Sequence, residues 1–201
     1  MNTIDVVYKR RAVKHFDPGH MMAEEEERKL VEATIEAPTS FNIQHWRFVI
    51  LRDPELRARI RKELGNDQAQ MTDASMLVLF TADVKAWQKE PERYWVNAPK
   101  EVSDLLVNWM GPFHQWREWL QRDEAQRSIG IAMQTLMLAA QDMGYRSCPM
   151  IRFDIEKVAE LVNLPDDHVM GPMVAIGKDI KEPWPKPGQL ALEELVFENT
   201  F

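Results

Sequence analysis

The sequence predicts a single domain that combines helices with strands. A chain of 201 residues, of which 45% are apolar, can bury one sizeable hydrophobic core. The run Met76–Thr81 is almost continuously apolar, which is typical of a strand buried on both faces. Residues 124–143 form the strongest helical pattern, nearly all apolar from Ile129 to Ala140. Such a helix must be covered on most sides, which places it at the centre of the domain or between two subunits.

Two helices, a strand and a third helix are predicted before the apolar strand, over residues 3–14, 23–37, 47–51 and 54–64. The second helix carries Glu24–Glu27 in its first turn, where carboxylates complement the helix dipole. The third helix has apolar residues four apart, at Leu56, Ile60 and Leu64, and Gly65 follows as its stop.

The second half of the chain begins with a segment of different composition, residues 84–122, which we interpret as a variable helical excursion over the core. It holds five of the seven tryptophans among many charges and three prolines. The helix 124–143 ends at Gly144, and strands over 147–151 and 169–176 follow, with a helix over 154–161 between them. Residues 181–201 form a proline-containing tail with a strand-like end at Leu195–Phe197, which favours an arm. No linker divides the chain, so residues 1–201 are predicted to be one domain.

Composition excludes several classes of function. A net charge of −7 argues against nonspecific nucleic-acid binding, which needs broad basic surfaces. No apolar run reaches the length of a membrane span, and the N-terminus lacks the apolar stretch of a signal peptide, so a cytoplasmic protein is expected. The single cysteine, Cys148, excludes an internal disulfide framework and a CxxC site. The five histidines lack metal-ligand spacing, so no metal site is predicted, and GxGxxG, P-loop and GxSxG motifs are missing.

A cluster of basic residues occupies Lys9–Lys14 in this otherwise acidic chain. On a continuous helix Arg10 and Lys14 share a face, with Arg11 to one side. Guanidinium groups bind phosphate through two parallel hydrogen bonds, so the cluster is a candidate anion site. The alternative is a solvated basic helix end.

A polar loop over residues 37–48 runs directly into the first strand. Its hydroxyl and amide groups exceed what a connector needs, and two aromatic residues anchor it. The polar residues are Thr39, Ser40, Asn42 and Gln44 after Pro38, and the anchors are Trp46 and Phe48. Such a loop suits recognition of the edge of a planar heterocycle, although a simple turn remains the alternative.

Further candidates are open to two readings each. Asn66, Gln68 and Gln70 alternate, so an extended backbone would direct all three to one side, whereas a polar turn is the other possibility. Cys148 has no identifiable base, which favours a small buried residue over a nucleophile. The tryptophan-rich excursion is predicted mainly to pack, but Trp95, Trp109 or Phe113 could cover a flat cofactor. The same three aromatic residues are the candidates for shaping a substrate pocket.

Taken in order, the motifs resemble those of the flavin-dependent nitroreductase family. They are Lys9-Arg10-Arg11-x-x-Lys14-x-Phe16-Asp17, Ala37-Pro38-Thr39-Ser40-x-Asn42-x-Gln44-x-Trp46-x-Phe48, Asp73-Ala74-Ser75, Met143-Gly144-Tyr145, Cys148-Pro149-Met150 and the tail from Trp184 to Leu190. The resemblance spans nearly the whole chain and is weakest over 84–122.

The resemblance implies an α+β fold, with a central, mostly antiparallel sheet flanked by helices and an intertwined homodimer that exchanges its C-terminal arms. It implies one FMN per subunit at the dimer interface and ping-pong chemistry. NADH or NADPH would donate hydride, and a nitroaromatic, quinone or similar small-molecule acceptor would take two electrons. The family uses no dedicated catalytic side chain, because the cofactor carries the chemistry.

The family pattern implies cofactor-binding roles for thirteen residues. The loop at Thr39, Ser40 and Asn42 would come from the opposite subunit, and a backbone N–H of 149–151 would meet flavin N5. Lys186 would bind the phosphate from the tail. The full set is Arg10, Arg11, Ala12, Lys14, Thr39, Ser40, Asn42, Gln70, Pro149, Met150, Ile151, Lys186 and Gln189.

Three residues depart from the family pattern. Ala12 replaces a common serine, and His45 replaces the usual proline before Trp46. Gln189 stands where many members have a second phosphate-binding arginine, which leaves more of the phosphate to Arg10 and Lys186.

Other functions compatible with these residues remain open. Within the fold, a reductive dehalogenase-like or enal-reducing specialist is possible. From another class, the chain could be a non-catalytic flavin-binding carrier or sensor. A cofactor-free interaction dimer would leave the polar loop and basic cluster without a role.

Overall fold

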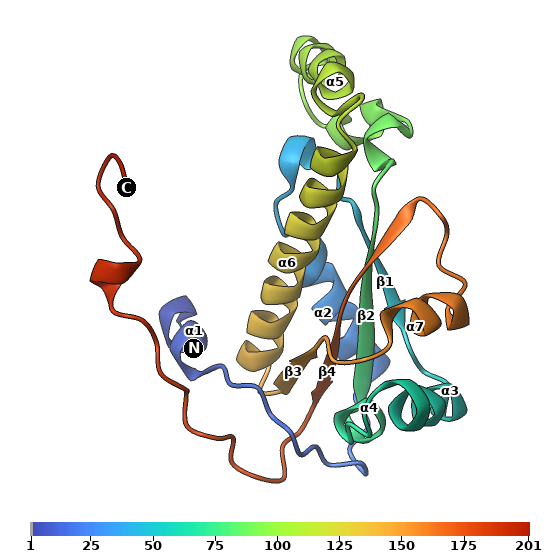
Figure 1. Ribbon diagram of the computed structural model, residues 1–201, viewed down its shortest axis with the longest axis vertical. Helices are drawn as coiled ribbons and strands as arrows, with labels where there is room; N and C mark the ends of the chain where they lie inside the picture. The colour runs from blue at the N-terminus through green and yellow to red at the C-terminus, as the bar shows by residue number, and fades with distance from the viewer. Residues whose placement is uncertain (1) are drawn as a thin grey trace.

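The computed structural model describes residues 2–201, in which a four-stranded antiparallel sheet lies between two layers of helices (Figure 1). The α+β architecture expected from the sequence is therefore confirmed. The strands are β1 Trp46–Ile50, β2 Met76–Asp83, β3 Arg146–Met150 and β4 His168–Gly177, in the spatial order β1-β2-β4-β3. The four strands predicted before the tail are all present, within two residues of their expected ends.

The central strand β2 is buried along its whole length, as its apolar sequence predicted. Alternate side chains of a strand point to opposite faces. Val78 and Phe80 pack on one face with residues of α2 and α6, while Leu77 and Leu79 pack on the other with residues of α3, α4 and α7. The sheet thus separates two hydrophobic cores, and one strand supplies both.

Seven helices form in the described chain. They are α1 Thr3–Lys9, α2 Glu24–Ile35, α3 Pro54–Arg59, α4 Gln70–Asp73, α5 Lys100–His114, α6 Glu118–Asp142 and α7 Ile155–Leu161. The predicted helix 54–64 continues after α3 as a π-helical turn, Ile60–Leu64. The excursion over 84–122 is helical, as expected, and α6 begins at its end, before the expected start at residue 124. None of the helices described is long and apolar enough to cross a membrane.

Helix α6 is the longest element and crosses one face of the sheet (Figure 1). It ends at Gly144, which adopts φ +79°, and the N–H of Tyr145 returns to the carbonyl of Ala140 at 2.8 Å. This is the αL ending that glycine favours. Close approach to β4 depends on Gly171, where a Cβ would lie 2.8 Å from Ile129 and 3.0 Å from the carbonyl oxygen of Phe80. A strip at Gly130, Ile131 and Gln134 remains exposed.

The prediction of one helix over residues 3–14 is wrong in its second half. Helix α1 ends at Lys9, and the chain then runs extended beside β3. Ala12 pairs with Ser147 in a parallel bridge, and the N–H of Val13 donates to the carbonyl of Ser147 at 3.0 Å. The exposed edge of β3 and the burial of Val13 outweigh the helical tendency. Arg10 and Lys14 therefore do not share a helix face.

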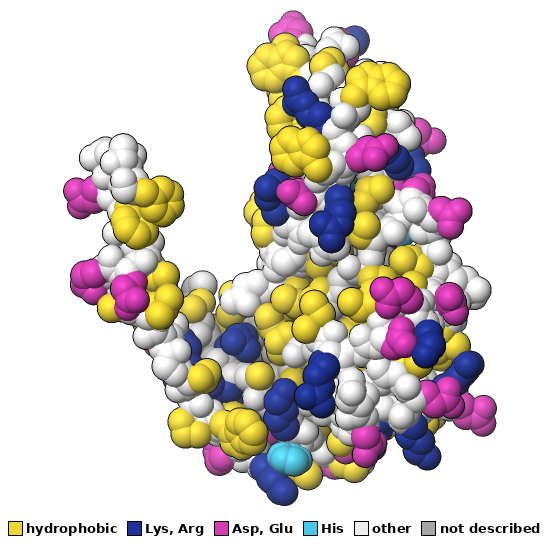
Figure 2. Space-filling model, in the orientation of Figure 1, with side chains coloured by type: hydrophobic (Ala, Val, Ile, Leu, Met, Phe, Trp, Pro, Cys, Tyr) yellow, Lys and Arg dark blue, Asp and Glu magenta, His cyan; other side chains and the backbone are white. Residues whose placement is uncertain are grey.

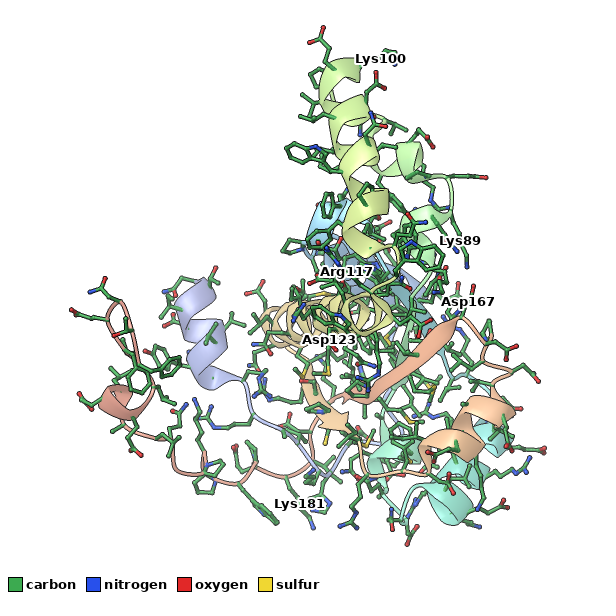
Figure 3. All side chains as sticks on the ribbon, turned by 45° about the horizontal axis from the view of Figure 1, so that its top comes forward. Lys89, Lys100, Arg117, Asp123, Asp167 and Lys181 are labelled. Carbon is green, nitrogen blue, oxygen red and sulfur yellow. The ribbon has the colours of Figure 1, made fainter. Side chains whose placement is uncertain are left out.

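The tail after β4 leaves the body on the α1 side of the molecule (Figures 1 and 3). Almost all of residues 181–201 are exposed, including Leu195, Val196 and Phe197 at 53–62%. These residues do not form the predicted strand, because no sheet edge of this chain lies beside them. A 3-10 turn covers Leu192–Glu194 instead.

Candidate functional site

Three distant segments of the chain converge at strand β3, around the side chain of Cys148. The Nζ of Lys14 lies 3.4 Å from its sulfur, and the Nε2 of Gln70 lies 3.7 Å from it. Cys148 itself is buried, as predicted for a small structural residue. Lys14 of the predicted basic cluster and Gln70 are thus both brought to Cys148.

The side chain of Arg10 has a buried nitrogen atom without a hydrogen-bond partner among the described residues. Arg10 caps the C-terminus of α1, and its side-chain atom Nη1 is buried without a hydrogen bond to any described residue. A buried cationic donor without an acceptor is costly, so an anion or carbonyl oxygen at this point would be strongly favoured. Arg11 is used differently, because its Nη1 donates to the carbonyls of Tyr8 at 2.6 Å and Arg10 at 2.9 Å.

Gln70 is buried at the start of α4, separate from the other two amides of its segment. The chain turns sharply at Asn66 and Asp67, where φ is 52° and 51°. The amide of Gln68 donates to the carbonyl of Arg152 at 2.8 Å, as does that of Asn66 at 3.2 Å. The extended arrangement with all three amides on one side is therefore wrong, and only Gln70 reaches the site.

The turn that carries Gln70 is clamped by Arg57, a residue that the sequence did not single out. Its Nε donates to the carbonyl of Met71 at 2.6 Å and its Nη2 to that of Ala74 at 2.5 Å. Burial lowers the pKa of this guanidinium. The local sequence of the helix gives no sign of this role, because the carbonyls of Met71 and Ala74 come from a later segment of the chain.

The end of β3 forms the rim of the convergent site. Pro149 is half-buried, Met150 is buried in the core beside Met173, and Ile151 is 67% exposed.

The polar loop lies elsewhere and is conformationally strained. Phe41, Asn42 and Gln44 have φ of 51°, 54° and 53°, in the left-handed region that non-glycine residues rarely adopt. Residues of this kind cost about 1–3 kcal/mol each and gather at functional sites. Trp46 anchors the loop as predicted: it is buried and stacks on Phe48 at 6.4 Å between ring centroids.

Some of the polar side chains of the loop form hydrogen bonds with other residues of the same chain. The hydroxyl oxygen of Thr39 accepts the N–H of Gln44 at 3.0 Å, and the amide nitrogen of Asn42 donates to the carbonyl of Tyr94 at 2.8 Å. The second bond ties the loop to the excursion. The hydroxyl hydrogen of Thr39 and the side-chain oxygen of Asn42 remain able to meet a ligand.

The loop and the basic cluster lie toward opposite ends of α6 (Figure 1). His45, just after the loop, contacts Ser128 in the N-terminal half of the helix. Ala12 pairs with Ser147, which follows the C-terminal end of the helix. The helix rises about 21 Å from Ser128 to Asp142. The predicted site residues therefore form two groups that one chain does not join.

Lys186 and Gln189 form a third location. Both are exposed in the tail.

The sequence model of the Nitroreductase family matches residues 7–178 of this chain. The chain belongs to the nitroreductase family. It is 61% identical over 201 residues to Protein DrgA of Synechocystis sp., covering 98% of this chain and 95% of that protein. It is 28% identical to a Bacillus subtilis protein provisionally named NAD(P)H nitroreductase MhqN, with 88% of each chain covered.

A solved structure shows the same fold. A protein from Exiguobacterium sibiricum, provisionally described as a nitroreductase and solved in complex with FMN, superposes with a TM-score of 0.89. The two chains are 24% identical, and the match covers 98% of this nitroreductase and 97% of the other. The nitroreductase-like architecture expected from the motifs is thus confirmed.

His45, which departs from the family pattern, is completely buried in this nitroreductase. Its Nδ1 lies 3.0 Å from the hydroxyl of Ser128, whose only hydrogen is donated to the carbonyl of Glu124 at 2.8 Å. His45 must therefore donate from Nδ1, which leaves Nε2 as an acceptor, and this atom is buried without a partner in residues 2–201. The pKa of His45 is lowered to about 4, mainly by burial and to a lesser extent by the nearby His114.

We expect the free energy of unfolding of this nitroreductase to decrease as the pH is lowered from 6.5 to 4, because of the protonation of His45. Its folded pKa lies below its unfolded value, so the unfolded chain binds more protons in that window. The contribution lost at pH 5 is about 2 kcal/mol relative to neutral pH. Urea unfolding at pH 7.5 and pH 5.0, at fixed protein and cofactor concentrations, measures it. His45→Gln should reduce the pH dependence by that amount.

The matched control is His15→Gln, because His15 is exposed. This variant should retain the full pH dependence. Equal pH dependence in His45→Gln and the parent protein would contradict the assignment.

A cluster that the sequence did not reveal lies at the far end of β2 and β4. Asp83, Asp167 and His168 have ligand atoms within 4.8 Å of one another. Lys89 already supplies a cation, with its Nζ 2.7 Å from Asp83 and 2.6 Å from Asp167 (Figure 3). The hydrogen bonds to the two carboxylates raise the pKa of Lys89, and Asp167 makes the larger contribution. The arrangement is a charge network that fastens the excursion to the sheet.

An aromatic pocket of about 340 Å³ opens where the loop meets α5. Its lining residues are Phe41, Trp109, Pro112, Phe113 and Arg117. Apolar side chains gather over this end of the molecule with basic groups among them (Figure 2). Of the three aromatic candidates, Trp109 and Phe113 line the pocket, and Trp95 packs in a neighbouring apolar cluster.

Proposed function

We propose that this nitroreductase is an FMN-dependent NAD(P)H oxidoreductase that acts as a homodimer. Small nitroaromatics, quinones or similar molecules would be its electron acceptors. The observation that carries the proposal is the Nη1 of Arg10, which is buried without a partner in residues 2–201. Arg10 belongs to the segment whose Ala12 pairs with β3 and whose Lys14 meets Cys148. A site with a donor that lacks an acceptor calls for an anionic or carbonyl-bearing ligand.

The residues present fit FMN, which carries a phosphate and a flat ring edged with carbonyls and nitrogens. Arg10 and Lys14 would meet anionic or carbonyl oxygens, the amide of Gln70 would meet the ring or ribityl chain, and the backbone at 149–151 would border the ring. Arg11 and Ala12 would contribute mainly backbone, because the Arg11 guanidinium caps α1 and Ala12 lies against β3. The relative from Exiguobacterium sibiricum binds this cofactor.

A second copy of the chain would complete the site. Thr39, Ser40 and Asn42 belong to the loop that lies toward the opposite end of α6 from the basic cluster, so we assign them to the cofactor of the partner. The exposed tail would reach the other subunit, with Lys186 directed to the phosphate and Gln189 as a weaker neighbour. The tail and α6 both expose apolar residues, and these surfaces would be buried when the arm packs on the other subunit.

Bound FMN would supply the redox chemistry, and the protein would position it and exclude water. With a quinone as acceptor, NAD(P)H, a proton and the quinone become NAD(P)⁺ and the hydroquinone. We assign donor and acceptor to the same pocket in turn, in a ping-pong sequence. The name of the Bacillus subtilis relative includes NAD(P)H as donor. We expect the protein to act in the cytoplasm.

The decisive experiment is purification followed by an activity assay. The protein should be yellow, should release FMN on denaturation and should oxidise NADH or NADPH when a nitroaromatic or quinone is added. Bound flavin without this oxidation would support the carrier or sensor function instead. A colourless protein that does not take up added FMN would contradict both.

Sedimentation tests the dimer independently. If the cofactor is held between subunits, loss of FMN should raise the concentration at which the dimer dissociates. A monomer that still bound FMN tightly would contradict the shared site.

A further inference from the structure

We propose that Arg117 binds the anionic group of an aromatic electron acceptor, so that this enzyme prefers acceptors carrying a carboxylate or sulfonate. The inference rests on the proposed function and adds a substrate class to it. It starts from the pocket where the polar loop meets α5. None of the thirteen predicted cofactor residues lines this pocket.

The pocket has walls suited to a flat ring. Phe41 and Phe113 lie 5.3 Å apart between centroids, at an interplanar angle of 51°, and Trp109 and Pro112 complete the apolar lining. Trp109 is 57% exposed and Phe113 38% exposed, which is a large apolar surface to leave in water. An aromatic ligand would stack on these rings and cover them.

Arg117 supplies the only charge among the five lining residues. Its Nη1 donates to the carbonyl of Phe113 at 3.0 Å, and its guanidinium carbon lies 5.8 Å from the centre of the Phe113 ring. These contacts hold the guanidinium at the mouth of the pocket, at the foot of α5 (Figure 3). The side chain is therefore placed before any ligand arrives.

The guanidinium of Arg117 is also available to an anion. Arg122, five residues later, lies 3.9 Å from Asp123, and Arg93 donates to the hydroxyl of Tyr94. In the described part of the chain no carboxylate forms a salt bridge with Arg117. The contact to the Phe113 carbonyl uses one of its five N–H donors, so a planar carboxylate can still be bound through two hydrogen bonds.

The pocket adjoins the proposed flavin wall. Phe41 stands between Ser40 and Asn42, both assigned above to the cofactor of the partner subunit, and Phe41 itself lines the pocket. A ligand that stacks on the flavin therefore also meets Phe41, with Arg117 beyond it. The electron acceptor must lie against the flavin, so its anionic substituent is the group that Arg117 would receive.

The test compares two acceptors that differ in charge, 4-nitrobenzoate and 4-nitrobenzamide, in the parent holoenzyme and in Arg117→Gln. The ratio of their kcat/KM values should favour the carboxylate in the parent and fall about tenfold in the variant, the loss of one charge-assisted contact. Arg117→Lys should keep most of the preference, since the charge remains. Added salt should weaken the preference of the parent.

The matched control is Arg122→Gln, which removes an exposed guanidinium from the next helix. It should leave the ratio unchanged. Equal ratios in the parent and Arg117→Gln, with normal FMN content and activity on 4-nitrobenzamide, would overturn the proposal and leave the oxidoreductase function intact.

The phosphates of the nicotinamide donor are the other possible anion. Flavin reduction by NADPH and by NADH, followed by absorbance without an acceptor, separates this case. We expect Arg117→Gln to leave both rates unchanged. A loss confined to flavin reduction, with the acceptor ratio unaltered, would overturn the assignment to the acceptor.

Binding without turnover separates the pocket from the redox chemistry. Calorimetric titration of the FMN-loaded protein with each nitro compound, in the absence of donor, should show the same carboxylate preference and its loss in Arg117→Gln. A preference seen in binding by a protein that oxidises no NAD(P)H would support the pocket and contradict the proposed activity. No preference in the parent would overturn the proposal.

Discussion

Arg10→Ala is expected to lower the affinity for FMN by about 10- to 150-fold, a loss of about 1.5–3 kcal/mol. Its Nη1 is buried without a partner in residues 2–201, so we assign its contact to the ligand. Because Ala would remove this unpaired buried donor, the folded protein should not be weakened. Quenching of FMN fluorescence on titration measures the affinity.

Two variants sharpen this experiment. Arg10→Lys should recover the affinity only in part, because an ammonium cannot bind two oxygens in the planar fork of a guanidinium. Arg28→Ala is the matched control, since Arg28 is exposed on α2 and pairs with Glu32 at 2.7 Å. An Arg10→Ala protein with parental FMN affinity would remove Arg10 from the site.

Arg57→Met is expected to lower the free energy of unfolding by about 2–5 kcal/mol. The guanidinium bonds two carbonyls in the turn through α4, and Met71 and Ala74 are both buried, so methionine would leave two acceptors unsatisfied. Relief from burying a charge offsets part of this loss. Urea unfolding at fixed protein and FMN concentrations measures the change.

Arg59→Met is the control on the same helix. Arg59 is exposed and pairs with Glu63 at 3.2 Å, so its loss should change stability by less than about 0.5 kcal/mol. Because the clamp orients Gln70, Arg57→Met should also weaken FMN binding. A variant as stable as Arg59→Met would show that the carbonyls find other partners.

The local patterns of the sequence were sufficient for the elements that the sheet and its helices need. Apolar runs located β2 and α6, and Gly144 marked the end of α6, because strand burial and the αL ending depend on neighbouring residues. The polar loop was also recognised, since its hydroxyls and amides are consecutive. Its strained φ values and its pocket with α5 were not, because they arise from packing against the distant excursion.

The basic cluster shows where local reasoning fails. Lys9–Lys14 has helical spacing, yet the chain after Lys9 is extended because β3, more than 130 residues later, offers an unpaired edge. For the same reason, the local sequence did not single out Arg57 or Arg117. Arg57 is buried against carbonyls of the α4 turn, and Arg117 lies at the aromatic pocket. Each role depends on carbonyls and rings that only folding brings near.

The sequence by itself determined the family, the α+β fold and the residue types of a flavin site, since these follow from consecutive residues and their spacing. Only the tertiary structure decided which of those residues meet. It brought Lys14 and Gln70 to Cys148 in β3, and it left the loop at the other end of α6. The physical reason is the rigid length of that helix, which separates the two groups of residues within one chain.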